Sequence, residues 1–95
     1  MKDIKKLNFL KERLKSEKVE TILIFYKGRM ISKMIGLEYS RTEKDAFFFK
    51  ISNSKTNYVL SKEEIEDLLV IPFDSTIIIL ILNSDINIEI KFVKE

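Results

Sequence analysis

The first seventeen residues alternate between apolar and polar positions at helical spacing. The apolar positions are Ile4, Leu7, Leu10 and Leu14, and lysines fill most of the remaining surface. This pattern predicts an amphipathic helix over residues 1–17 whose apolar side packs on a sheet. A basic helix for a membrane surface or a nucleic acid is the alternative. Acidic residues are interspersed among the lysines, which favours packing on a sheet.

The rest of the chain has the composition and the alternation of short strands. β-Branched and aromatic residues gather in segments separated by turn-forming residues, among them Gly28. We predict strands over residues 19–26, 29–39, 46–52, 58–60, 76–82 and 87–94. Gly36 interrupts the second of these strands and predicts a bulge or a bend at that point.

A second, shorter helix is predicted before the last two strands. Ser61 followed by Glu64 matches a capping box, and acidic residues crowd the positions where a helix macrodipole favours anions. The helix would end near Leu69, because Pro72 prevents its continuation. Together these elements predict one α+β domain over residues 1–95. It would be a twisted antiparallel sheet or small open barrel of five to six strands, with an N-terminal helix and a short helix before the C-terminal hairpin.

The two strands of the last hairpin differ in whether one or both of their faces are apolar. The second strand alternates between apolar and polar residues, whereas the first is aliphatic throughout. The aliphatic residues are Ile77, Ile78, Ile79, Leu80, Ile81 and Leu82. Burying six such side chains contributes about 9–18 kcal/mol before opposing terms, which is comparable to the ~5–15 kcal/mol net stability of a domain. We therefore expect both faces to be covered, by the two helices or, as we favour, by a second copy of the chain. One alternating set of three would lie in that interface.

The composition excludes several classes of protein. The chain has no cysteine and no histidine, which removes disulfides, thiolate metal sites and the commonest general base. The serines therefore cannot form a Ser-His-Asp triad, and the sequence has no glycine-rich phosphate loop. We predict a non-enzymatic protein without a cofactor or a metal site. No apolar run reaches the length of a membrane span or a secretory signal, so we expect a cytoplasmic protein without membrane contact.

Charge is distributed unevenly along the chain, although the net charge is only +2. Residues 1–60 carry 14 basic and 7 acidic side chains, and residues 61–95 carry 3 and 8. A basic face for an anionic partner is one interpretation, and solvated side chains around a core are the other, favoured because the basic residues are dispersed. The candidate nucleic-acid contacts are Tyr26, Arg29, Arg41, Phe48 and Lys50, with Phe48 available to stack on a base. A central strand covered on both faces would explain Phe48 equally and is the interpretation we favour.

The N-terminal two-thirds of the chain carry a resemblance to a known family. The segment FLKERLKSEKVETILIFYKGRMISKMIG, residues 9–36, gives a helix, a strand, a glycine turn and a second strand. Over residues 7–72 this order resembles the Sm-like, Hfq-type small β-barrel proteins. The matching positions are the turn glycine Gly28 and the apolar Ile31 and Ile35. Lys33 stands where the family has a second glycine, and Tyr39 stands where it has an acidic residue. The resemblance implies a helix on a bent five-stranded barrel that forms RNA-binding rings, but it assigns no RNA-binding residue here.

These observations predict a small interaction protein. The leading expectation is a homodimer or higher homo-oligomer that binds a macromolecular partner, with an unidentified protein as that partner. The alternative is an Sm-like protein that binds RNA. The abundance of Ile (15 residues) and Lys (14) together with the small size favours an accessory protein encoded by a virus or plasmid.

Overall fold

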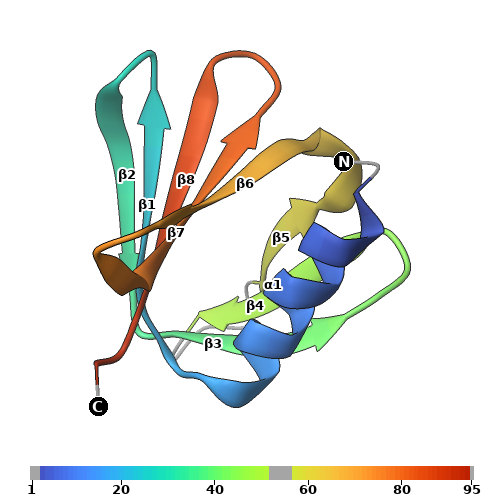
Figure 1. Ribbon diagram of the computed structural model, residues 1–95. Helices are drawn as coiled ribbons and strands as arrows, with labels where there is room; N and C mark the ends of the chain where they lie inside the picture. Colours follow the sequence, from blue (N-terminus) through green and yellow to red (C-terminus); the bar gives the residue numbers. More distant parts are fainter. Residues whose placement is uncertain (1–2, 52–56, 95) are drawn as a thin grey trace.

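A computed structural model shows one helix packed against two antiparallel sheets (Figure 1). The structure describes residues 3–51 and 57–94. The helix α1 spans Ile4–Ser16, and the strands are β1 (Val19–Tyr26), β2 (Arg29–Ile35), β3 (Leu37–Thr42), β4 (Ala46–Ile51), β5 (Asn57–Ser61), β6 (Ile65–Ile71), β7 (Asp74–Leu82) and β8 (Ile86–Phe92). The predicted α+β class and the predicted N-terminal helix are confirmed over these residues.

The strands form a five-stranded sheet in the order β2-β1-β8-β7-β6 and a three-stranded sheet in the order β3-β4-β5. The chain passes from the larger sheet to the smaller one at Gly36, whose φ of 73° lies in the region that favours glycine. It returns through a single 3₁₀ turn, Lys62–Glu64. The two sheets are therefore joined at two corners and remain an open arrangement (Figure 1). The predicted bend at Gly36 is confirmed, and it divides the expected second strand into β2 and β3.

The core lies between the two sheets and is closed by the apolar side of α1. Leu10 and Leu14 of the helix are buried there together with Phe47 and Phe49 of β4. The larger sheet contributes alternate residues of its central strands, namely Ile22, Ile78, Leu80, Ile88 and Ile90. The helix begins where Asp3 caps it by accepting a hydrogen bond from the backbone N–H of Lys6, at 3.2 Å.

The predicted second helix is wrong beyond its first turn. Only residues 62–64 form a 3₁₀ turn, Ser61 makes no side-chain capping bond, and strand β6 begins at Ile65. The physical reason is the edge of β7 that β8 leaves unpaired. Its backbone N–H and C=O groups need partners, and β6 supplies them along most of its length. Local capping signals are therefore overridden by a strand pairing that is formed elsewhere in the chain.

The structure also corrects the number and the limits of the strands. Eight strands are present among the described residues, instead of five to six. The additional ones arise from the bend at Gly36 and from β6. Ser52, the last residue of the expected third strand, and residues 53–56, which follow it, lie outside the described residues. Within the described part of the chain, the single helix has 13 residues and is too short and too polar to cross a membrane.

Candidate interaction face

The two faces of the five-stranded sheet differ in what lies over them. The face toward α1 and the smaller sheet, called here the inner face, is buried. The opposite, outer face is defined by the residues that alternate with the buried ones and pair across neighbouring strands. Its apolar members are Leu23, Phe25, Met30, Ile35, Leu69, Ile77, Ile79 and Ile81.

The apolar residues of the outer face are incompletely buried. The three on the edge strands are the most accessible, with Ile35 66%, Met30 56% and Leu69 44% exposed. The others are partly shielded by their neighbours in the sheet. Among the described residues, the helix and the smaller sheet both lie on the inner side, so no other element of the described chain packs over the outer face (Figure 1). An uncovered apolar sheet face of this kind is a recognised signature of an interaction surface.

A polar stripe divides the outer face along its central strand. Asn87, Glu89 and Lys91 of β8 lie between the apolar residues of β1 on one side and those of β7 on the other. The Nζ atom of Lys91 is 3.7 Å from an Oε atom of Glu20, a loose and exposed ion pair. Within the described chain Glu89 makes no ion pair. The stripe therefore places charged side chains at the centre of the face. A purely apolar partner would bury them without an oppositely charged group to pair with them.

The structure divides the six aliphatic residues of the hairpin into two sets. Ile78, Leu80 and Leu82 point into the chain's own core and are buried. Ile77, Ile79 and Ile81 point outward and remain partly accessible. Of the two sets considered for self-association, only the outward one is positioned to reach another molecule.

The candidate nucleic-acid contacts are separated into two groups. Tyr26 and Arg29 flank the β1–β2 turn, whereas Arg41, Phe48 and Lys50 lie on the outer side of the smaller sheet. Arg29 begins β2, and the other six residues of that strand, about 20 Å at ~3.3 Å per residue, separate it from the bend at Gly36, where the chain enters the smaller sheet (Figure 1). They therefore do not form one contiguous patch.

The second group has one close internal contact. The Arg41 guanidinium carbon lies 4.1 Å from the centre of the Phe48 ring, and the Nε atom of Arg41 donates to Glu43 at 2.8 Å. Phe48 is partly exposed, and Phe47 and Phe49 are buried on the opposite side, as the alternation predicts. One side of the Phe48 ring is therefore covered by the guanidinium of Arg41, whose side chain is half exposed.

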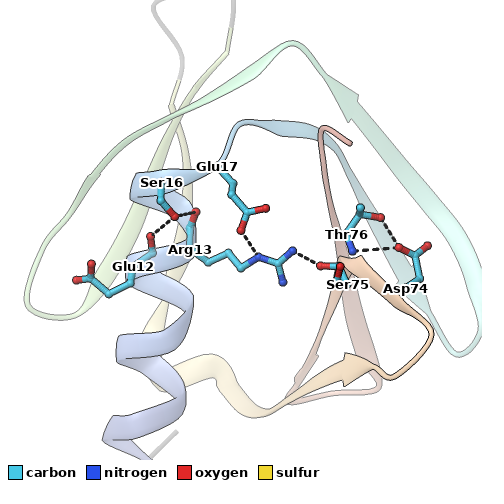
Figure 2. Close-up of polar contacts among 7 residues, drawn as sticks. All are labelled: Glu12, Arg13, Ser16, Glu17, Asp74, Ser75 and Thr76. Carbon is cyan, nitrogen blue, oxygen red and sulfur yellow. Dashed lines mark hydrogen bonds and ion pairs between the residues drawn. The ribbon is translucent and has the colours of Figure 1, made fainter. Parts of the chain in front are cut away.

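Polar contacts of Arg13 hold the last turn of α1 against the larger sheet, at the start of β7 and the end of β8. The Nε atom of Arg13 donates to Glu17 at 2.5 Å, and the same guanidinium donates to the carbonyl oxygen of Ser75 (Figure 2). The guanidinium carbon also lies 4.6 Å from the centre of the Phe92 ring. Arg13 thereby connects the last turn of α1 with the first residues of β7 and the end of β8.

Two carboxylates, Asp67 on β6 and Asp74 at the start of β7, have pKa values below the ordinary range. A hydrogen bond from Lys6, 2.5 Å long, and a second from the backbone N–H of Leu68 lower the pKa of Asp67. The same contact with Asp67 raises the pKa of Lys6. Hydrogen bonds from the side chain and backbone of Thr76 lower the pKa of Asp74 (Figure 2). Each carboxylate is held by structural partners, so these pKa shifts indicate local stabilisation of the fold.

Several residues of the outer face were missed by the sequence analysis. Leu23 and Phe25 belong to β1, which reads TILIF over residues 21–25, a run almost as continuously apolar as that of β7. That run carries the same signal of a strand with apolar residues on both faces. Ile35 and Leu69 could not be assigned to a face without the register of their strands.

Comparison with family models, with curated proteins and with solved structures finds no match for this chain. In the described residues, no group of acidic side chains is arranged to hold a metal ion. The outer face of the larger sheet therefore stands as the candidate functional site on its own geometry.

Proposed function

We propose that this chain is a non-enzymatic interaction protein that acts as a homo-oligomer and associates through the outer face of its five-stranded sheet. The observation that carries the proposal is the partial exposure of Ile77, Ile79 and Ile81 beside the more exposed Ile35 and Leu69. Apolar surface removed from water contributes about 25 cal/mol per Å². A face with eight apolar side chains thus has a substantial driving force for association, whereas a monomer would keep this surface in water.

The outer set of β7 is the natural place to test the proposal. Replacing Ile79 and Ile81 together by Thr keeps β-branched side chains, which suit a strand, but removes apolar surface. We expect the wild-type protein to have a multiple of its 11.2 kDa chain mass in light scattering after size exclusion, and the Ile79→Thr, Ile81→Thr variant to have the mass of one chain. A wild-type protein with the mass of one chain at high micromolar concentration would contradict the proposal.

A matched control is available on the smaller sheet. Val59 is 48% exposed on the outer side of that sheet, and Val59→Thr is the same kind of change on a surface that the proposal does not use. We expect Val59→Thr to leave the mass unchanged. A loss of association in both variants would indicate general destabilisation, which circular dichroism would detect.

Binding of RNA by an Sm-like protein is the second candidate function. The contact that favours it is Arg41 over Phe48, because an arginine plane can stack on an unpaired base, and Lys50 lies on the same side of the sheet. If this face binds RNA, affinity for a single-stranded oligonucleotide should fall steeply between 50 and 200 mM salt. It should also fall further when Arg41 is replaced by Ala. Binding that is unchanged by salt or by Arg41→Ala would remove this candidate.

A further inference from the structure

The polar stripe on β8 restricts which partner can cover the outer face. Glu89 and Lys91 lie at the centre of the face, in the middle strand of the five, with apolar residues on both sides. A partner that covered them with apolar groups would desolvate both charges without compensation, which is strongly unfavourable. The face therefore fits a partner that presents the opposite charges at the same spacing, within an apolar surround.

A second copy of this chain meets both requirements. Glu89 and Lys91 are two residues apart on one strand, so their side chains point to the same face about 7 Å from each other. Two copies can stack face to face about a two-fold axis that lies between the two sheets, perpendicular to the strands and level with Ile90. The two β8 strands are then antiparallel, and each Glu89 faces Lys91 of the other copy. Stacked sheets lie about 10 Å apart, which the combined lengths of a glutamate and a lysine can bridge.

The same arrangement brings the apolar parts of the face together. An axis perpendicular to the strands places β1 over β1 and β7 over β7 of the second copy. Because the axis lies level with Ile90, Ile79 then faces Ile77 of the second copy and Leu23 faces its Thr21, while Phe25 and Ile81 lie toward the ends of the contact. Rotation about an axis parallel to the strands would instead oppose Glu89 to Glu89 and Lys91 to Lys91. The charges thus favour the antiparallel arrangement.

The size of the face is consistent with a stable dimer. Five strands about 4.8 Å apart, with about seven residues each at ~3.3 Å, cover roughly 24 by 23 Å, or about 550 Å² of flat area. Side chains raise the accessible area above this flat area. A standard protein interface buries about 800 Å² per partner. The outer face as a whole is needed to approach that value, so a contact limited to β7 would be too small.

We propose that the chain forms a two-fold dimer in which the outer faces of two larger sheets stack, with reciprocal Glu89–Lys91 ion pairs across the centre. This inference rests on the proposed self-association and adds its partner, symmetry and specificity. The ion pairs fix the register of two otherwise uniform apolar surfaces and disfavour other apolar partners. Lys91 would exchange its loose contact with Glu20 for this central pairing.

Charge reversal tests the pairing directly. Glu89→Lys and Lys91→Glu should each weaken dimerisation at least tenfold, as measured by sedimentation equilibrium, because each dimer then has two like-charged pairs. An equimolar mixture of these two variants should form a heterodimer, since every central pair is again of opposite charge. The double variant Glu89→Lys, Lys91→Glu should dimerise like the wild type. Lys33→Glu is the control, a charge reversal on an edge strand of the same face, and should have a smaller effect.

The outcomes separate this inference from the proposal on which it rests. If Ile79→Thr, Ile81→Thr abolishes association but the charge-reversed double variant is not restored, the face is correct and the antiparallel pairing is wrong. Single reversals that dimerise as well as the wild type would overturn the pairing in the same way. A wild-type protein that is monomeric would overturn both statements. Circular dichroism spectra identical to that of the wild type are required of each variant, and the half-exposed position of Lys91 makes this the expected result.

Discussion

The two sides of β7 have almost the same amino acids and different surroundings. Ile78, Leu80 and Leu82 are buried against the helix and the smaller sheet, whereas Ile77 and its outward neighbours are only partly shielded. Composition alone cannot distinguish these sides, because both are aliphatic. The difference is decided by the elements that the rest of the chain places over one side and not over the other. A continuous apolar run in a strand thus predicts that both faces of the strand need to be covered. In β7 the described chain covers only the inner face.

The largest expected effect is on the inner side. Leu80→Ala removes a fully buried side chain from the centre of the core, and we expect the free energy of unfolding to fall by about 2–5 kcal/mol. Ile79→Ala is the matched change one residue away on the outer side. In urea titrations at a concentration where the protein is monomeric, it should lower the free energy of unfolding by about 1 kcal/mol or less. Equal losses in the two variants would mean that the two sides are not different in the monomer.

A smaller effect is expected where the helix is fixed over the inner side. Arg13→Met keeps much of the packing of the side chain, which is 12% exposed, but removes its contacts with Ser75 and the Phe92 ring. We expect a loss of about 1–2 kcal/mol in thermal or urea unfolding, from one charged hydrogen bond and one cation–π contact. Arg41→Met, a matched change at a more exposed arginine on the smaller sheet, should change stability much less.

The pH dependence of stability should reflect the contact that fixes the first half of the helix to the larger sheet, between Lys6 and Asp67 of β6. Because the pKa of Asp67 is lowered in the folded state, its contribution is present above the ordinary carboxyl pKa of about 3.9 and is lost as pH falls through the folded value. Lys6→Met removes the main cause, so the pKa of Asp67 should rise and the loss of stability in acid should become smaller. Carboxyl carbon NMR titration measures the pKa directly. Asp74 serves as the internal control, because Thr76 holds its pKa low independently of Lys6.

The smallest expected effect on the monomer is at the rim of the outer face. Ile35→Ser changes a side chain that is already mostly in water, so the free energy of unfolding should stay within about 0.5 kcal/mol of the wild type. Association should nevertheless weaken, because the replaced residue would lie at the edge of the proposed interface. A variant with unchanged stability and unchanged mass in light scattering would show that association does not extend to β2.

Part of this fold could be predicted from the sequence because its signals are local. The stripe of Leu10 and Leu14 identified the helix, the β-branched segment 19–26 identified β1, and Gly36 marked the bend. The strand β6 could not be predicted in the same way. Its residues begin with a capping pattern at Ser61, and their true structure depends on the free edge of β7, which lies later in the sequence.

The candidate site was predicted only as an alternative between two sets of residues. The alternation of a strand defines the two sets, but the choice between them depends on where α1 and the smaller sheet pack. The contribution of β1 depends on its pairing with β8, from Ile22 with Ile90 to Ile24 with Ile88, which no local pattern indicates. Pairings between distant parts of the chain therefore account for most of what the sequence did not reveal.

The pairing of β1 with β8 also determines when the protein can fold during synthesis. The larger sheet has its earliest strands beside its latest one, so it cannot form until β8 has left the ribosome. Before that moment β1 and β2 are an isolated hairpin, which is marginally stable in water, with both of its apolar sides exposed. We therefore expect the nascent chain to expose apolar surface until the last strand is complete, and conditions that slow translation of the last strands to increase aggregation.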